Sequence, residues 1–253
     1  MLRQLLLINF NTFLSKGYVD IGGIIILIGV IFGIAYGLLR WRKALAETLP
    51  HITSYSLSAA SKAKILVNNL GIDVFYQKPI ADCSRTRWIA HLALFWGFLG
   101  LAVTTTLDEI VNPAAAPLIL TSPVRILGNI SGVLFVAGVS ISLARRLFVP
   151  SVRENSTRGD FVFLLLLFLT GISGFMTEIF SDLNVVFPDS FSYWFHIILV
   201  TALLASAPFS KFVHAIGRPI LLLVKRSEIE KSRLAEADTK HPVQTTSQKK
   251  ETD

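Results

Sequence analysis

Five long apolar stretches constrain the fold of this 253-residue chain more than any other feature of its sequence. Each is long enough to cross the hydrocarbon core of a bilayer, which takes about 20 helical residues. They run roughly over residues 21–39, 88–107, 126–144, 161–177 and 191–210. Because a backbone in lipid must satisfy its own hydrogen bonds, these stretches predict an all-helical integral membrane protein, a bundle of five membrane-spanning helices.

Charged residues are scarce and unevenly placed. They make up 16% of the chain, against about 25% in a typical soluble domain. Lys and Arg gather between the first and second spans, between the third and fourth, and after the fifth, whereas the opposite loops carry Asp108, Glu109, Asp182 and Asp189. This positive-inside pattern predicts a multi-pass protein of the cytoplasmic membrane, with its N-terminus outside and its C-terminus in the cytoplasm. The net charge of +7 therefore indicates topology and not binding of nucleic acid.

The sequence predicts three regions. Residues 1–18 form an outer interfacial segment, for which a cleaved signal peptide is the alternative. Residues 19–224 form the membrane domain, with a long cytoplasmic loop at 40–87, and residues 225–253 form a cytoplasmic tail that is partly disordered. So long a loop is either a docking surface for a cytoplasmic partner or a solvated segment near anionic lipid.

Histidines in or beside apolar spans are the first candidates for chemistry, because ionisable residues there are rare and usually functional. His196 and His214 lie 18 residues apart near the two ends of the fifth span. On one continuous helix they would project from the same face, about 27 Å apart at a rise of about 1.5 Å per residue. A neutral imidazole is a good iron ligand, so the pair suits haem. Two interfacial histidines at the ends of a helix are the alternative.

A third histidine favours the haem interpretation. His91 lies a few residues past the predicted cytoplasmic boundary of the second span. Since the second span runs outward and the fifth inward, His91 and His214 should lie at the same depth and face each other across an interhelical gap. Gly97 and Gly100 remove side-chain bulk nearby, which suits a macrocycle, although helix packing explains them as well.

Two residues near the opposite end of the bundle are further candidates. Met176 lies near the depth of His196 and is either a sulfur ligand or a packing residue. Arg125, at the start of the third span, either donates a hydrogen bond to a quinone carbonyl or extends to the lipid headgroups.

The spans resemble the membrane cytochrome b (gamma) subunits of respiratory nitrate reductase. They also resemble related membrane subunits of heterodisulfide reductase and of sulfite-reductase-associated complexes. The similarity is strongest in His91–Gly100, Gly128–Arg146, Gly159-Asp160 and His196–His214. The loop sequence from Asp73 to Lys78 resembles the heterodisulfide reductase branch more than the nitrate reductase branch.

In the nitrate reductase type, four histidines on the second and fifth helices hold two b-type haems. The resemblance implies that His91 and His214 hold the haem on the cytoplasmic side, and that His196 is one ligand of an outer haem. The position of the other outer ligand, ten residues after His91, is Leu101 here. The outer haem is therefore held by His196 alone, completed by Met176 or another ligand, or absent.

The resemblance implies an electron-transfer subunit of a hetero-oligomeric complex rather than an enzyme alone. Such a haem b protein transfers electrons between the (mena)quinone pool and an iron–sulfur subunit on the cytoplasmic face. The only cysteine, Cys83, cannot assemble an iron–sulfur cluster by itself, so any cluster belongs to the partner. A haem-free membrane anchor or a small transporter, with structural or proton-handling histidines, is the alternative.

Overall fold

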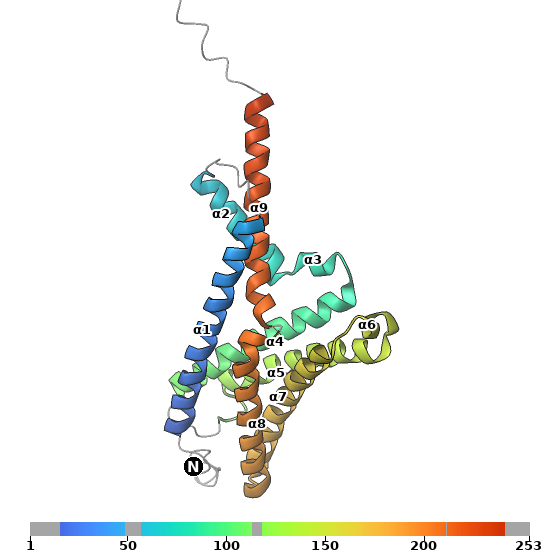
Figure 1. Cartoon of the computed structure of the whole chain (residues 1–253). Coiled ribbons are helices and arrows are strands. Elements are labelled where there is room, and N and C mark those ends of the chain that lie inside the picture. The colour runs from blue at the N-terminus through green and yellow to red at the C-terminus, as the bar shows by residue number, and fades with distance from the viewer. Residues whose placement is uncertain (1–15, 49–56, 113–117, 211, 241–253) are drawn as a thin grey trace, which may run out of the picture. The chain divides into compact units, whose positions relative to one another are not determined.

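The computed structural model of the chain describes residues 16–48, 57–112, 118–210 and 212–240 (Figure 1). These residues form helices and the turns between them, with no β-strand among them. Five of the described helices are long and apolar enough to cross a membrane, over Gly17–Leu39, Arg85–Val111, Pro123–Phe148, Arg158–Leu183 and Asp189–Phe209. The predicted all-helical fold with five spans is confirmed. Each span begins a few residues before the start predicted from hydropathy.

The chain divides into two compact units. The first contains the described residues up to Tyr36 together with Gln77–Val213, and the second contains Gly37–Tyr76 and the residues from His214 onward. Helix α1 (Lys16–Thr48) contributes to both units. The predicted outer segment at residues 1–18 lies almost wholly outside the described residues.

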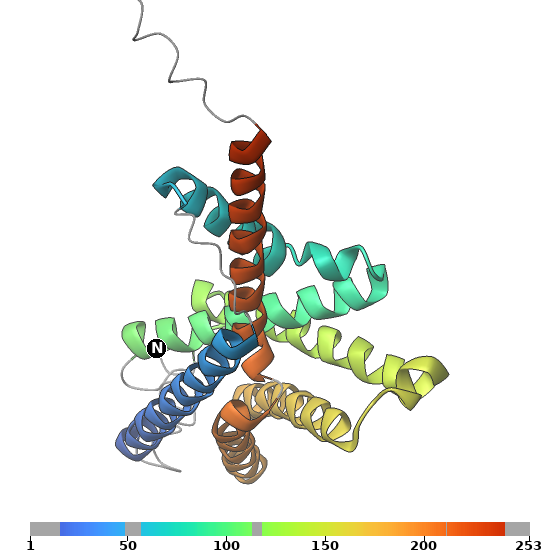
Figure 2. The same ribbon diagram turned by 45° about the horizontal axis from the view of Figure 1, so that its top comes forward.

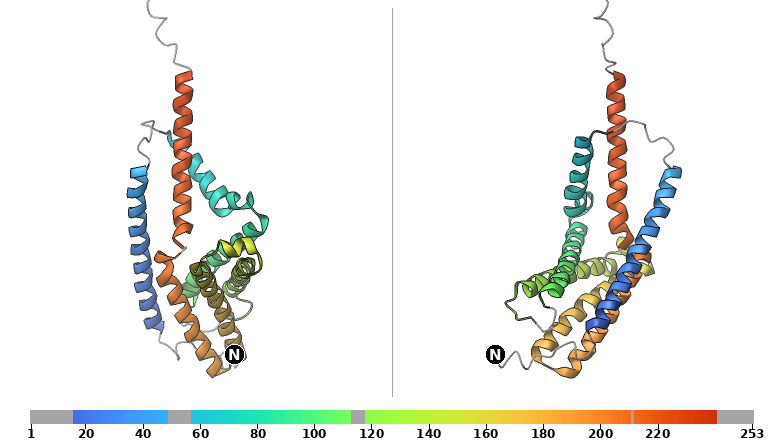
Figure 3. Two further views of the ribbon diagram at one scale, coloured as in Figure 1. Left: turned by 45° about the vertical axis from the view of Figure 1, so that its right-hand side comes forward. Right: turned by 90° about the vertical axis from the view of Figure 1, so that its left-hand side faces the viewer.

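The first unit is built on four long helices that pack in chain order. They are α4 (Arg85–Val111), α5 (Pro123–Phe148), α7 (Arg158–Leu183) and α8 (Val186–Ser206); α6 (Pro150–Glu154) is a short helix between α5 and α7. Helix α4 packs along α5, α5 along α7, and α7 along α8 (Figures 1 and 2). The α7–α8 pair forms a hairpin that Asn184 closes in a left-handed conformation, with φ 55° (Figure 3).

Local sequence signals set where these helices begin. The Ser84 hydroxyl accepts a hydrogen bond from the backbone N–H of Arg87 at the start of α4. Thr157 and Asp160 form a reciprocal capping box at the start of α7, and Pro123 occupies the first turn of α5. The cap at Ser84 places His91 about two turns into α4.

Glycines bring α4 and α5 into close backbone contact. A Cβ atom added to Gly97 would collide with the backbone of Phe135. One added to Gly100 would collide with Ser131, and one added to Gly138 would lie 2.5 Å from a backbone nitrogen of α4. Of the two roles that the sequence allowed for Gly97 and Gly100, the structure supports helix packing.

The hydrophobic core lies where these four helices meet. Its buried members are Phe135, Val139, Leu164, Leu167 and Leu203. Leu101 of α4, at the position where the resemblance calls for a histidine, packs against this core.

The antiparallel helices give the first unit two ends of opposite charge. We call the end where α4 and α7 begin the His91 end; its helices carry Arg85, Arg87, Arg145, Arg146 and Arg158. We call the end where α5 and α8 begin the Arg125 end; its helices carry Asp108, Glu109, Glu178, Asp182 and Asp189. The charge asymmetry of the sequence is therefore kept in three dimensions. That the His91 end is cytoplasmic stays a prediction.

The continuous helix predicted from His196 to His214 is wrong. Helix α8 ends at Ser206, a turn of 3-10 helix follows (η3, Ala207–Phe209), and α9 (Phe212–Lys240) begins only after this break. The two histidines therefore lie on different helices, and the separation of about 27 Å along one face does not apply.

Pro208 accounts for this break. Proline has no backbone N–H with which to continue the helical ladder, so carbonyls in the preceding turn lose their partner. Serine hydroxyls on both sides supply hydrogen bonds instead: Ser206 donates to the carbonyl of Leu203, and Ser210 to that of Ala207.

The second unit contains short helices from the predicted 40–87 loop and the helix α9. Helix α2 (Ala59–Asn68) leads into the π-helix η2 (Asn69–Phe75), whereas the loop's last helix, α3 (Lys78–Ala81), belongs to the first unit. The Asn69 amide donates to the carbonyl of Pro219 within α9 at 3.0 Å. Asp73, whose side chain is 2% exposed, pairs with Arg226 at 2.6 Å. The η2 segment of the predicted loop thus contacts α9, whereas residues 241–253 of the tail lie outside the described residues.

Candidate functional site

His91 is held by a residue from the segment that precedes α4. Its Nδ1 lies 2.9 Å from the amide oxygen of Gln77. An amide oxygen only accepts, so Nδ1 carries the hydrogen and Nε2 carries the lone pair. This is the tautomer in which an imidazole binds a metal through Nε2, with its other nitrogen donating to a protein acceptor.

Gln77 adopts an unusual backbone conformation. Among the described residues, only Gln77 (φ 58°, ψ 42°) and Asn184 combine a side chain with a positive φ. This conformation costs about 1–2 kcal/mol for a residue with a Cβ, so the surrounding structure must enforce it. Gln77 is buried, and its carbonyl accepts from the N–H groups of Ile80 and Ala81 at the start of α3. The turn and the contact with His91 are therefore set together.

The predicted partner of His91 is His214, in the first turn of α9. Its side chain lies outside the described part of the structure, and the residue belongs to the second unit. The pairing of His91 with His214 stays a prediction.

His196 lies in the middle of α8 and packs against α7. Its Nδ1 is 2.9 Å from the hydroxyl oxygen of Ser173. The neighbouring Gly174 makes room for the ring, because a Cβ there would lie only 3.2 Å from His196 Cε1. The Ser173-Gly174 pair thus forms the seat of the imidazole.

The Ser173 hydroxyl indicates which nitrogen of His196 carries the hydrogen. It donates to the carbonyl of Thr170 at 3.0 Å. Since a hydroxyl has one hydrogen, Ser173 then accepts from His196 Nδ1, and the lone pair of His196 lies on Nε2. In this arrangement His196 has the same tautomer as His91.

Met176, the other candidate ligand of an outer haem, lies on α7. Met176 follows Ser173 by three residues, which places it about 60° around α7 from the residue that contacts His196. Its side chain is 39% exposed, whereas Ser173 and Thr177 are buried against α8. A sulfur ligand at this position stays an untested prediction.

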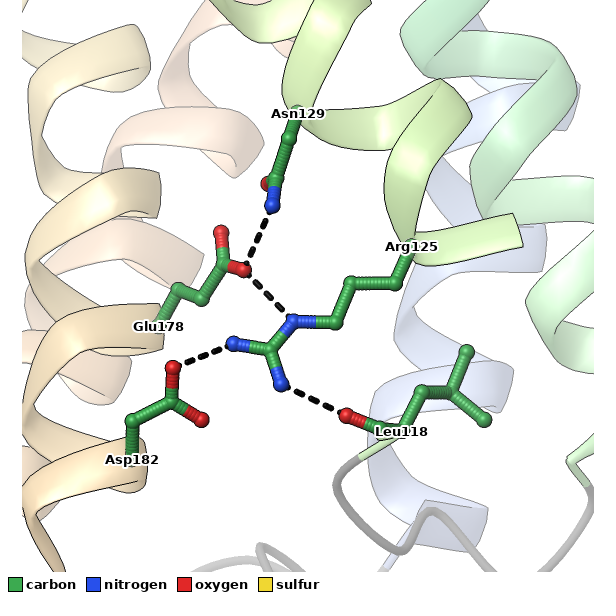
Figure 4. Close-up of polar contacts among 5 residues, drawn as sticks. All are labelled: Leu118, Arg125, Asn129, Glu178 and Asp182. Carbon is green, nitrogen blue, oxygen red and sulfur yellow. Dashed lines mark hydrogen bonds and ion pairs between the residues drawn. The ribbon is translucent and has the colours of Figure 1, made fainter. Parts of the chain in front are cut away.

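Arg125, near the start of α5, donates to three acceptors (Figure 4). Its Nε donates to Glu178 at 2.7 Å, one terminal nitrogen donates to Asp182, and the other to the carbonyl of Leu118 at 2.6 Å. Asn129 donates to the same oxygen of Glu178 at 2.9 Å. We call these residues the Arg125 cluster.

The Arg125 cluster ties α5 to the end of α7. The Arg125 side chain is 11% exposed, and all three of its nitrogens are bonded to protein. Its extension to the lipid headgroups stays a prediction. Its three described hydrogen bonds use three of its five N–H groups. Contact with a quinone carbonyl is therefore compatible with the cluster and stays a prediction.

Gln77 and Ser173 are the residues that sequence reasoning missed. Gln77 precedes His91 by fourteen positions, and its contact depends on a left-handed turn that no local glycine or asparagine indicates. Ser173 does carry a signal, since a serine beside a glycine at the depth of a histidine in the next span suits a side-chain contact between helices.

These histidines fit haem by the chemistry of their donors. A six-coordinate haem takes a single axial ligand from each side, and it needs no cluster of protein ligands. Within the described residues, no group of three or more His, Cys, Asp or Glu side chains is arranged to hold a metal ion. His91 and His196 instead stand singly on membrane-spanning helices, each with Nδ1 bonded to protein and the lone pair on Nε2, the nitrogen through which an imidazole binds iron.

Comparison with known proteins identifies relatives of this chain. The family model HdrE, which describes the HdrE component of dihydromethanophenazine:CoB–CoM heterodisulfide reductase, matches residues 67–222. The HdrE protein of Methanosarcina thermophila is 28% identical over 201 residues, which is 74% of this chain and 73% of the relative. That of Methanosarcina barkeri is 30% identical, over 65% of this chain and 68% of the relative.

A more distant relative covers nearly the whole chain. The respiratory nitrate reductase 1 gamma chain of Escherichia coli is 25% identical over 249 residues, which is 88% of this chain and 98% of the relative. No solved structure matches the chain. The region matched by the family model contains Gln77, His91, His196 and His214.

Proposed function

The chain belongs to the HdrE family of heterodisulfide reductase components, and on that premise we propose that it is the haem b membrane subunit of a respiratory oxidoreductase complex. It transfers electrons between a lipid-soluble carrier and an iron–sulfur subunit on the cytoplasmic face. The carrier takes up or releases two electrons together with two protons. The carrier is a (mena)quinol or a dihydrophenazine, the class that appears in the names of the Methanosarcina relatives.

His91 carries this proposal. It lies on a membrane-spanning helix beside the apolar core, and the buried Gln77 directs its lone pair to Nε2. When bound there, haem supplies a one-electron redox centre between the carrier and the partner subunit. The chain's own contribution is to fix the orientation of the His91 imidazole, to hold it at one depth in the membrane and to exclude water.

His214 is the proposed second ligand at the His91 end. His196 is proposed as a ligand of a second haem, although Leu101 supplies no ligand opposite it. On this assignment one haem lies at the His91 end, and a second depends on a donor other than Leu101.

The His91 end is the proposed docking face for the iron–sulfur subunit. Its helices carry five arginines, and the positive-inside rule assigns such an end to the cytoplasm. Cys83, at the same end, is a single exposed thiol, so cluster ligands come from the partner.

The haem-to-protein ratio of the purified complex tests the proposal. We expect at least one b-type haem per chain in the natural sequence and one fewer in His91→Ala. The control is His241→Ala, a histidine in the predicted tail, which should leave the ratio unchanged. A correctly assembled complex without haem b would favour the membrane anchor or transporter instead.

A further inference from the structure

The interface between α7 and α8 changes character along its length. Towards the His91 end it is apolar, with Leu164 and Leu167 of α7 and Leu203 of α8 buried in the core. Towards the Arg125 end its buried residues are polar: Thr170, Ser173, Thr177 and Ser181 on α7, and Asp189 and Ser192 on α8, near His196. Most of the buried polar residues in the described part of the chain lie on this interface.

These residues form one stripe on each helix, because they recur every three or four positions. The contact between Ser173 and His196 sets the register of the antiparallel pair. At equal rise per residue, Ser192 is then level with Thr177, and Asp189 lies within one residue of the level of Ser181. We call these residues, with His196, the polar seam; it runs about 10 Å from His196 to Asp189.

Packing explains most hydroxyl groups of the seam. Ser173 donates to the carbonyl of Thr170, Thr177 donates to that of Ser173 at 3.0 Å, and Ser192 donates to that of Asp189 at 2.9 Å. Each of these hydroxyls is satisfied within its own helix, and small side chains let membrane helices approach closely.

Packing does not explain Asp189. The residue is 0% exposed, and neither of its carboxylate oxygens has a hydrogen-bond partner among the described residues; the same holds for the hydroxyl of Ser181. Asp182, beside Ser181 in the sequence, pairs with Arg125 instead. A buried carboxylate without a partner costs several kcal/mol, and ionisable residues in membrane spans usually handle ions or protons.

We propose that Asp189 accepts protons from the reduced carrier and that the polar seam links it to the depth of His196. This inference rests on the proposed function of the chain. Asp189 and Ser181 lie within one residue of the same level and lack partners among the described residues, so they suit an ordered water between them. Such a water, with the hydroxyls of the seam, provides donors and acceptors that exchange roles.

Oxidation of the carrier supplies both the protons and the electrons of this step. Oxidation of one carrier molecule breaks two O–H or N–H bonds and yields two protons and two electrons. Haem held by the proposed histidine ligands would supply the one-electron centre between the carrier and the iron–sulfur subunit, which is the oxidant. Each proton bonds in turn to a carboxylate oxygen of Asp189 and then leaves to water at the Arg125 end, which the charge pattern assigns to the outer side.

Asp189→Asn in the whole complex tests this inference, because it keeps the shape of the side chain and removes the proton acceptor. In proteoliposomes we expect carrier-driven haem reduction to slow by about 100-fold, with less proton release to the outer side. Haem content and reduction by dithionite should not change. Asp189→Glu should restore part of the rate. The control is Glu109→Gln, which removes an exposed carboxyl at the same end on α4 and should leave the natural rate unchanged.

The outcomes separate this inference from the proposed function. A natural rate and proton yield in Asp189→Asn, with haem present, would overturn the role of Asp189 alone. Absence of haem from the natural complex would overturn the proposed function itself. If Asp189→Asn fails to assemble, Ser181→Ala decides: slower carrier-driven reduction at full haem content supports the seam, and an unchanged rate overturns it.

Discussion

His91 and His196 are held by different kinds of partner in the two halves of the bundle. His91 binds Gln77, whose amide oxygen only accepts and which comes from a buried turn outside the bundle helices. His196 binds Ser173, a hydroxyl on the facing helix that can accept or donate. The partner of His91 therefore allows one tautomer by its chemistry alone, whereas the partner of His196 selects that tautomer only while the Ser173 hydroxyl donates to Thr170.

The surroundings of the two imidazole rings also differ, in polarity. Near His91 the backbones of α4 and α5 approach closely at glycines, and the neighbouring core is apolar. Beyond His196 lie the polar seam and the Arg125 cluster. A metal ligand needs a fixed lone pair, whereas a proton route needs groups that change roles. The contrast supports electron transfer at the His91 end and proton handling at the other.

The largest expected effect is the loss of a haem in His214→Ala. If His214 shares an iron with His91, its replacement removes the same haem as His91→Ala, and the double variant loses no more. His196→Ala should leave that haem in place. Haem-to-protein ratios and low-spin signals of the four variants check this, and a normal low-spin signal in His214→Ala would break the pairing.

A smaller effect is expected where α4 meets α5. Gly97→Ala places a methyl group against the backbone of Phe135, and such overpacking costs about 1–3 kcal/mol. Gly29→Ala in α1 is the matched control, because a Cβ there meets nothing within 4 Å. Thermal unfolding in detergent compares the two, and equal midpoints would contradict the close contact of α4 with α5.

Gln77→Gly separates the contact with His91 from the turn that presents it. Glycine adopts the left-handed conformation freely, so the turn should persist or become more stable while the hydrogen bond is lost. We expect haem affinity to fall by about 10- to 100-fold. The midpoint potential should rise, because a less basic imidazole stabilises the ferric state less.

Haem titration and redox titration of Gln77→Gly measure these effects. Gln77→Asn, which tolerates the same backbone but carries a shorter amide, should fall between glycine and glutamine. An unchanged potential in Gln77→Gly would show that His91 does not depend on this partner.

The smallest effect is expected at the Arg125 cluster. Arg125→Leu leaves Glu178 and Asp182 without their cation, but both carboxylates are partly exposed, so water compensates for much of the loss. We expect about 1 kcal/mol of lost stability and no change in haem content. Unfolding midpoints measure the change in stability, and absorbance measures the haem content. Loss of haem would show that the cluster affects the His91 end, which would weaken the contrast between the two ends.

The five spans could be predicted because lipid imposes both length and apolar composition on a helix. The break after Ser206 could not, because the composition stays apolar across it and Pro208 alone marks the change. Hydropathy also assigned Asp189 to a loop, since it counts a carboxylate as a boundary, whereas the structure places this residue at the start of the fifth span.

The candidate ligands could be predicted, but what orients them could not. Ionisable residues in apolar spans are rare and usually functional, and His91 and His196 are residues of this kind. The contact of His91 with Gln77 depends on a turn between helices, and that of His196 with Ser173 on the register of two helices. Neither the turn nor the register can be predicted from hydropathy.

The most direct test of the central claim is the absorbance of the purified complex before and after addition of the reduced lipid-soluble carrier. Our account predicts that the bands of reduced haem b appear in the natural protein and, for the haem at the His91 end, fail to appear in His91→Ala. A complex that contains its partner subunits but shows no haem b band, even with dithionite, would contradict it.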